Sequence, residues 1–212
     1  MKNKKIDYTN SIGHQHYDKK VYKKLNKKFL KSLKTINQEL NTENNPFHSF
    51  SKNFQFNFRI KDLRGFRKFK TVVIIGMGGS ILGSEAIYTF LNKNIKKNFL
   101  FLDDIDLKKI EEIKNYQKKK ILFIIISKSG NTIETISNLL SLRIIKKNAK
   151  NIIIISEKNN SSLFMLSKNL KLKFIEHKNY IGGRYSVLSE VGMLPAYLMG
   201  LNIKNFRANL LN

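Results

Sequence analysis

The chain has 212 residues, of which 42% are hydrophobic, so it can bury one sizeable core and is not an intrinsically disordered chain. It contains no cysteine and only 4 histidines, which excludes a disulfide framework and any thiolate zinc site, and we expect no metal. The 40 Lys and Arg against 15 Asp and Glu give a net charge of +25, but the basic residues are spread over every segment, so we expect no nucleic-acid partner.

The first part of the sequence predicts a basic helical extension, which we place at residues 1–46. Its apolar residues recur every three or four positions between lysines, as on one face of a helix. They are Val21, Leu25, Phe29, Leu33, Ile36 and Leu40. Such a helix can lie on an acidic membrane surface, but packing against the protein's own domain is the commoner arrangement and the one we expect.

From the sequence we expect neither a membrane-spanning segment nor a signal peptide. No segment approaches the ~20 consecutive apolar residues of a membrane span. Residues 1–17 also lack the apolar core of a signal peptide. We therefore expect no membrane partner and a cytoplasmic location.

A phenylalanine-rich segment follows at 47–69, with Phe54, Phe56 and Phe58 in alternation. Exposed aromatic and basic residues in this spacing can form a stacking platform for single-stranded nucleic acid. The RGF stretch at 64–66 begins like the aromatic strand motif of RNA-recognition domains, but two basic residues then replace the small residue and the aromatic that the motif requires. We expect instead that the phenylalanine side chains fill the core.

From residue 71 onward, short apolar runs alternate with helical patterns. We predict strands at 71–75, 98–102, 120–126, 151–155 and 172–175. We predict helices at 81–92, 107–117, 132–147, 161–169 and 191–201. Strands that are apolar without interruption are typical of a sheet covered on both faces, and the alternation indicates βαβ units. The predicted fold class is therefore α/β, a doubly wound and mainly parallel sheet.

The first of these strands runs into a glycine turn, GMGGS at 76–80, and then into a helix. The free N–H groups and the positive dipole end of such a junction favour an anion. With Asp103 after the next strand, the turn resembles a dinucleotide fingerprint, but Ile81 stands at the third glycine and no P-loop Gly-Lys-Ser/Thr follows. Alone, a glycine turn can also simply close a tight bend.

A second junction of this kind follows the strand at 120–126. Its polar residues are Ser127, Lys128, Ser129 and Thr132. Capping of the next helix by Ser129 or Asn131, with Glu134 as a first-turn acid, is one explanation, but capping needs a single hydroxyl. Three hydroxyls, an ammonium group and helix N–H groups form a cup of hydrogen-bond donors that suits a phosphate monoester.

A third stretch, IGGRYSVLSEVGMLP at 181–195, places two glycines before Arg184. A single arginine usually makes an ion pair or lies on the surface. Held by a glycine turn at the same sheet edge, however, Arg184 could stabilise an oxyanion that develops on a substrate.

Together, GMGGSILG, SKSGNTIET and GGRYSVLSEVGMLP closely resemble the glucose-6-phosphate isomerase family, of the sugar isomerase (SIS-domain) class, in the right order from about residue 71 to 201. The resemblance implies a SIS, flavodoxin-like sandwich and the reversible isomerisation of glucose 6-phosphate to fructose 6-phosphate through an enediol, without metal or cofactor. It implies a phosphate cradle of Ser127, Lys128, Ser129 and Thr132, a second substrate turn with Gly79 and Ser80, an enediolate-stabilising Arg184, and Glu134 as an acid that orients a histidine.

The resemblance also implies groups that lie downstream of the arginine stretch: the proton-shuttling glutamate, the ring-opening histidine and a late lysine. No matching motif surrounds His14, His16, His48 or His177. We expect residues 47–212 to be the first SIS domain, with the second SIS domain absent from this chain. The complete protein should be a homodimer, and this chain alone should isomerise slowly or not at all.

One alternative is a non-catalytic SIS module that binds sugar phosphates. It would use the same cup of hydroxyls, but it has no evident need for an arginine over the reacting carbons.

Overall fold

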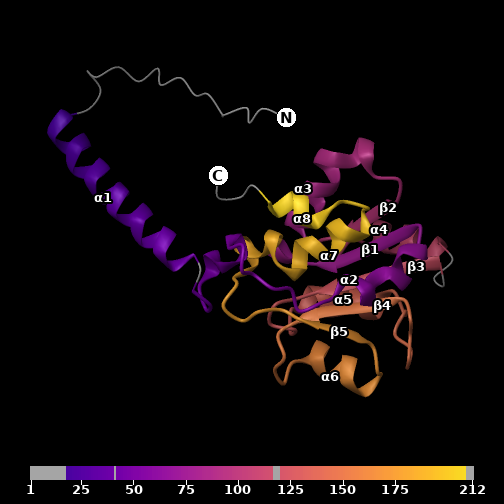
Figure 1. Cartoon of the computed structure of the whole chain (residues 1–212). Coiled ribbons are helices and arrows are strands. Elements are labelled where there is room, and N and C mark those ends of the chain that lie inside the picture. The colour runs from indigo at the N-terminus through magenta and orange to yellow at the C-terminus, as the bar shows by residue number, and fades with distance from the viewer. Residues whose placement is uncertain (1–17, 41, 117–119, 209–212) are drawn as a thin grey trace. The chain divides into compact units, whose positions relative to one another are not determined.

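The computed structural model describes residues 18–40, 42–116 and 120–208, in two units, Met1–Glu39 and Leu40–Asn212 (Figure 1). In the first unit, helix α1 (Lys19–Glu39) starts after Asp18, whose side chain accepts a hydrogen bond from the Lys20 N–H at 2.6 Å. The apolar stripe of α1 is exposed, with Leu25 at 58%. The predicted helix is confirmed, and its packing against the other unit stays a prediction.

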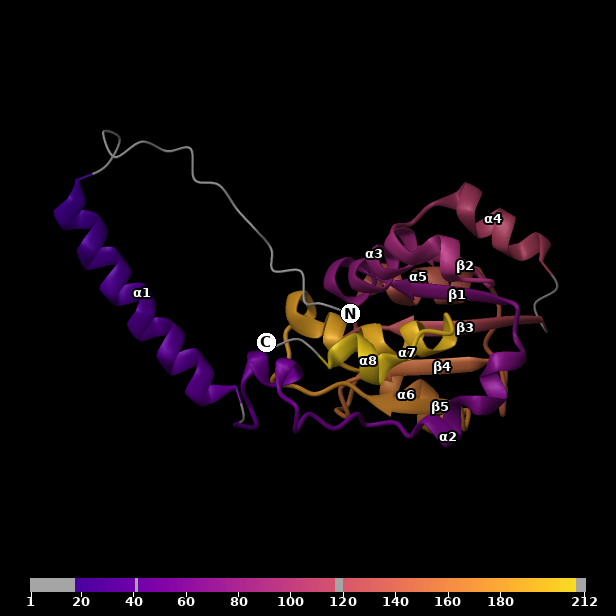
Figure 2. The same cartoon turned by 45° about the horizontal axis from the view of Figure 1, so that its top comes forward.

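The second unit is built on five parallel strands in the order β2-β1-β3-β4-β5, which Figure 2 shows side by side. The strands are β1 (Thr71–Gly76), β2 (Asn98–Leu102), β3 (Ile121–Ile126), β4 (Ile152–Ser156) and β5 (Lys173–Glu176). Every predicted strand is present, and the doubly wound parallel sheet is confirmed.

The strand order reverses direction between β1 and β3, because the chain visits β2 at one edge and then crosses back. Doubly wound sheets bind ligands beyond the carboxyl ends of their strands at such a switch point. The register pairs Gly76 with Ile126, so the two strands end side by side. The glycine turn and the hydroxyl-rich loop after β3 therefore begin at adjacent positions.

Alternate strand residues point to opposite faces and form two hydrophobic clusters. Val72 and Ile74 face helices α3 (Leu82–Leu91), α7 (Glu190–Leu198) and α8 (Ile203–Arg207). Val73 and Ile75 face helices α4 (Leu107–Asn115), α5 (Ile133–Ser141) and α6 (Ser162–Asn169). Figure 1 shows α7 and α6 on opposite sides of the sheet, so the unit has three layers.

Short helices complete the unit. They are α2 (Ile60–Leu63) and the 3₁₀ helices η2 (Pro46–Phe50), η3 (Arg64–Lys68), η4 (Gly78–Ser80), η5 (Asn92–Asn94) and η7 (Gly183–Leu188).

Helix α5 is shorter than predicted, because it ends at Ser141 instead of residue 147. Arg143 adopts the left-handed conformation with φ 50°, which terminates an α-helix. Leu142 and Ile144 then turn into the second hydrophobic cluster. The periodic pattern continued across this point, so the end depended on tertiary packing.

The phenylalanine-rich segment fills the interior, as expected. Phe54 and Phe58 are 6% and 8% exposed, and the rings of Phe56 and Phe58 stack with centroids 4.8 Å apart. A platform for nucleic-acid bases needs exposed rings, and Phe54 and Phe58 do not provide them. The absence of a nucleic-acid partner itself stays a prediction.

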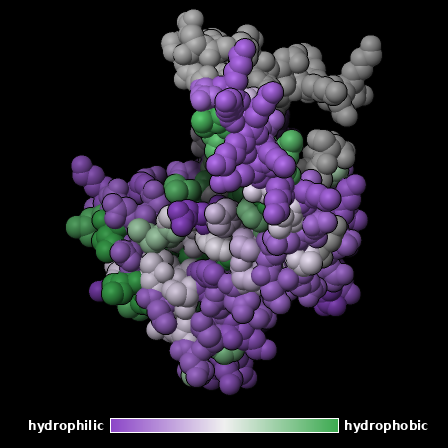
Figure 3. Space-filling model, turned by 90° about the vertical axis from the view of Figure 1, so that its left-hand side faces the viewer, coloured by the Kyte–Doolittle hydropathy of each residue, from purple (hydrophilic) through white to green (hydrophobic). Residues whose placement is uncertain are grey.

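The surface in Figure 3 is hydrophilic over most of the face shown, with small apolar patches between. None of the helices in the described ranges combines the length and apolar character needed to cross a bilayer. The cytoplasmic location stays a prediction.

Candidate active site

The glycine turn after β1 lies directly against the backbone of η7. A Cβ atom on Gly79 would lie 2.3 Å from the carbonyl carbon of Gly183 and 2.7 Å from the Arg184 nitrogen. Real Cβ atoms do not come this close to backbone, so this approach requires glycine at position 79. The contact places Arg184 beside the glycine turn, although 105 residues separate Gly79 from Arg184 in the sequence.

Serine hydroxyl groups secure this contact from the inside. The buried Ser186 Oγ lies 3.1 Å from the Gly79 carbonyl oxygen and 2.6 Å from that of Gly183. Ser84 Oγ donates to the Val191 carbonyl at 3.1 Å and joins α3 to α7. Ser189 caps α7 and donates to the Ser186 carbonyl at 2.7 Å. These three serines are therefore structural.

Arg184 itself is exposed. Within the described residues its side chain has no ion pair and no hydrogen bond. The guanidinium group is therefore free to meet a ligand, and it serves no internal ion pair among these residues.

The loop between β3 and α5, residues 127–132, is the cup loop. Ser127 is 2% exposed, and its Oγ lies 2.8 Å from Thr132 Oγ1 and accepts a hydrogen bond from the Gly130 N–H at 3.1 Å. Gly130 has φ 70°, a conformation that favours glycine, and a Cβ there would lie 2.2 Å from Ser161 Oγ. The loop is thus folded tightly around the Ser127 hydroxyl.

Helix α5 has Thr132 at its N-cap, with no side-chain capping hydrogen bond. Capping by Ser129 or Asn131, considered from the sequence, is not what these residues do. Ser129 Oγ accepts from the Asn131 N–H at 3.2 Å within the loop, and Asn131 Oδ1 accepts from the Ser162 N–H at 2.8 Å. Within the described part of the chain, the first-turn N–H groups of α5 therefore have no side-chain acceptor, which favours an anion.

Capping differs among the four helices that follow β1 to β4. Asp106 caps α4 and Ser161 caps α6 with side-chain hydrogen bonds. In contrast, Ile81 and Thr132, at the starts of α3 and α5, make none. The uncapped helices are the two that begin at the switch point.

Lys128 forms an ion pair in the described structure. Its Nζ lies 3.6 Å from Glu157 Oε1, with the side chains 33% and 22% exposed. Sequence reasoning missed Glu157, which follows β4 and faces Lys128 only because β3 and β4 are neighbours.

Ser80 and Glu134 complete the residues that the sequence singled out. Ser80 is 8% exposed, and the Cβ of Ser80 would lie 3.4 Å from a Cβ built on Gly76, next to the end of β3. Glu134 lies in the first turn of α5 and is partly buried. The structure thus brings the glycine turn, the cup loop and Arg184 to one edge of the sheet, whereas the role of each residue stays a prediction.

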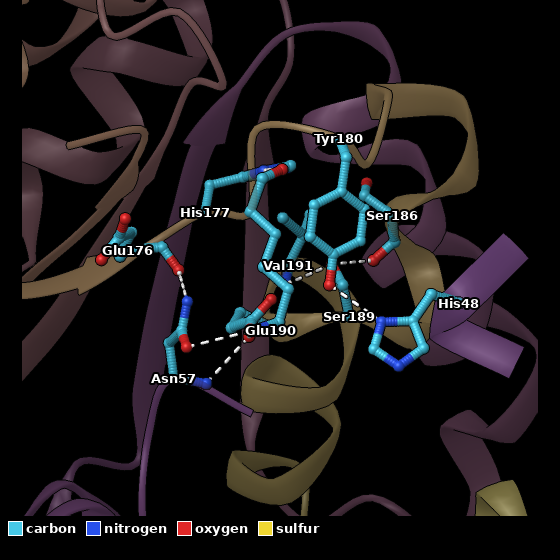
Figure 4. A network of polar contacts seen from close by, with 10 residues as sticks. His48, Asn57, Glu176, His177, Tyr180, Ser186, Ser189, Glu190 and Val191 are labelled. Atoms are coloured by element: carbon cyan, nitrogen blue, oxygen red, sulfur yellow. Dashed lines mark hydrogen bonds and ion pairs between the residues drawn. The ribbon is translucent and has the colours of Figure 1, made fainter. Parts of the chain in front are cut away.

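A second polar cluster, missed from the sequence, surrounds Glu190 at the start of α7 (Figure 4). Glu190 is 0% exposed, and its Oε1 accepts from the Asn57 N–H at 2.8 Å and lies 3.9 Å from Lys178 Nζ. Burial raises the pKa of the Glu190 carboxyl, opposed by these partners. Its sequence signal was an acid within an otherwise apolar helix.

Burial disfavours the charged form of both histidines in this cluster. His177 is 1% exposed, its Nδ1 donates to the Lys178 carbonyl at 2.9 Å, and burial lowers its pKa to about 4. His48 Nδ1 lies 2.9 Å from the Tyr180 hydroxyl, and burial lowers the pKa of His48 as well. Among the described residues, no three His, Asp or Glu side chains are grouped to hold a metal ion.

The fold and these loops define a doubly wound α/β protein whose polar turns and uncapped helices converge at the switch point of the sheet. The family model of phosphoglucose isomerase matches residues 4–211. This chain belongs to the phosphoglucose isomerase family.

Similar proteins agree with this assignment. The chain is 34% identical over 159 residues to a glucose-6-phosphate isomerase of Carboxydothermus hydrogenoformans, covering 66% of this chain and 34% of that protein. It is 33% identical over 212 residues to that of Prochlorococcus marinus, covering 95% and 38%. A crystal structure of the glucose-6-phosphate isomerase of Chlamydia trachomatis matches with a TM-score of 0.56 and 27% identity, covering 71% and 31%. The chain thus spans about a third of the length of these relatives.

Gly79→Ala should lower the free energy of unfolding by about 2 kcal/mol or more, because the added methyl group meets backbone that cannot move aside. Gly65→Ala is the matched control, because a Cβ at Gly65 meets nothing within 4 Å, and its change should stay within about 0.5 kcal/mol. Urea unfolding measures both. Equal stability of the two variants would show that the Gly79–Gly183 contact is not needed.

His177→Asn should reduce the loss of stability in acid. Between pH 6.5 and 4 the unfolded chain protonates His177 and the folded protein does not, so stability falls as the pH falls, by about 3 kcal/mol across the window. Asparagine keeps a donor for the Lys178 carbonyl but does not titrate. Unfolding free energies at pH 7 and 4.5 test this, and the difference between the two proteins is the readout, because Glu190 and His48 also titrate.

Proposed function

We propose that this chain is the part of a glucose-6-phosphate isomerase that binds the phosphate of the substrate and polarises its reacting carbons. The observation that carries the proposal is the difference in capping between α3 and α5 on the one hand and α4 and α6 on the other. Uncapped N–H groups at the positive end of a helix dipole bind anions. Family membership supplies the class of ligand.

In this proposal the phosphate lies in the cup loop. Lys128, Ser129 and Thr132 donate to its oxygens together with the first-turn N–H groups of α5, and charge-assisted hydrogen bonds make this contact strong. Ser127 already bonds Thr132 and Gly130, so it contributes by holding the shape of the loop.

The other turns act on the sugar. The isomerisation moves a proton between two neighbouring carbons through an enediol, and negative charge develops on the substrate oxygens. Arg184, which has no ion pair among the described residues and is held beside Gly79, stabilises that charge without having to reorganise. Gly79 and Ser80 line the substrate between Arg184 and the cup loop, and Glu134 orients a histidine.

The proton transfer itself needs a positioned base. The family resemblance places the base glutamate and the ring-opening histidine downstream of the stretch at 181–195. We therefore assign the transfer to those groups in the complete protein, and residues 1–212 alone bind ligand but isomerise slowly or not at all.

Lys128→Met should weaken the binding of inorganic phosphate and of fructose 6-phosphate by about ten- to a hundredfold, because a charge-assisted hydrogen bond is lost. Isothermal titration calorimetry measures both. Lys158→Met is the matched control, since Lys158 is an exposed lysine outside the cup loop. Equal affinities of the Lys128 variant and the wild type would contradict the proposed cradle.

Arg184→Ala should distinguish an isomerase site from a binding module. A five-carbon aldonate phosphate carries a carboxylate where the enediolate would carry its charge, so its affinity should fall by about thirtyfold or more. Inorganic phosphate should bind as before, and Arg64→Ala, at an exposed position, should change neither. If the site only binds sugar phosphates, Arg184→Ala would leave its preference for the aldonate phosphate over inorganic phosphate unchanged.

A further inference from the structure

Glu157 meets Lys128 because the pairing of β3 with β4 continues past the strand ends. The Ser127 N–H donates to the Ile155 carbonyl at 3.1 Å, and the Glu157 N–H donates to the Lys128 carbonyl at 3.0 Å. These two backbone bonds place the side chains of Lys128 and Glu157 side by side, with Nζ and Oε1 3.6 Å apart. The ion pair is therefore set by the backbone register.

The carboxylate of Glu157 is also held from its other side. Asn159 Nδ2 donates to Glu157 Oε2 at 3.3 Å. Two thirds or more of each side chain in the pair is covered, so water screens their attraction only in part. Before a ligand arrives, the charges of Lys128 and Glu157 cancel within the site.

We infer that Glu157 sets the ligand affinity of the cup loop by competing with the phosphate for Lys128. The inference rests on the proposed function, because it requires an anion in this loop. A phosphate that takes Lys128 has to share it with a fixed carboxylate, and the two anions repel each other. Glu157 therefore makes phosphate binding weaker than the donors of the loop alone would allow.

Such a limit suits a reversible isomerisation. The phosphate group is the same in substrate and product, so contacts to it strengthen both complexes equally and do not accelerate the chemical step. Excess phosphate affinity would only slow product release in either direction. Glu157 keeps the binding of this shared group moderate.

The test is Glu157→Gln, which keeps the shape of the side chain and removes its charge. Calorimetric titration at low salt should show inorganic phosphate and fructose 6-phosphate binding about three- to fivefold tighter than to wild type, the range that a partly exposed ion pair supports. Glu176→Gln is the matched control. Glu176 lies at the end of β5 and lines the same cavity of ≈ 400 Å³ as Glu157, but it has no ion pair with Lys128. Its affinities should stay within about twofold of wild type.

Two further measurements separate the possible failures. The double variant Lys128→Met/Glu157→Gln should bind no tighter than Lys128→Met, because Glu157 acts through Lys128. Without ligand, acylation of the Lys128 amine, followed by mass spectrometry, should be faster in Glu157→Gln than in wild type and unchanged in Glu176→Gln.

Unchanged or weaker phosphate binding by Glu157→Gln, a gain that persists without Lys128, or equal acylation rates would each overturn the inference. Failure of the wild type to bind phosphate would overturn the proposed function. The acylation rates would still report on the ion pair in that case.

Discussion

The close approach of two backbones, Gly79 against Gly183, is the constraint on which the site depends. It requires a residue without a side chain at position 79, and it brings Arg184 to the turn that follows β1. Ser186 bonds both carbonyl groups and holds the contact in place. Because the ends of β1 and β3 are already neighbours in the sheet, one contact between glycines is enough to gather three distant stretches at one edge.

The electrostatics of the site also depend on the switch point of the sheet. The two helices that begin at the switch point have no side-chain caps, and the helices on either side of them do. Leaving a helix start uncapped costs about 1 kcal/mol of stability, so a ligand that supplies the missing acceptors regains that energy on binding. The Glu157 carboxylate opposes this attraction at close range. On the proposed function, the affinity of this edge for an anion is a balance between the uncapped helix N–H groups and the Glu157 carboxylate.

Much of the fold and of the candidate site could be predicted from the sequence, because the decisive signals were local. Each apolar run that forms one of β1 to β5 is continuous, and the glycines at 76–79 and the hydroxyls of the cup loop each lie within a few neighbouring residues. The end of α5 could not be predicted, since the left-handed Arg143 follows from packing and not from the pattern. Glu157 and Glu190 could not be identified from the sequence for a similar reason. The partner of Glu157 is set by strand order, and that of Glu190 by the fold of the phenylalanine-rich segment.

Helix α7 is covered by more of the chain than the sheet alone. All nine of its residues are buried, yet the sheet covers only one of its sides. The phenylalanine-rich segment covers another: Phe58 shares its cluster, the Asn57 N–H bonds Glu190, and Arg67 lies over the ring of Tyr197. The autonomous folding unit therefore begins upstream of the first strand. A truncation at Thr71 would keep the whole sheet but would remove the segment that covers one side of α7 and so expose that helix.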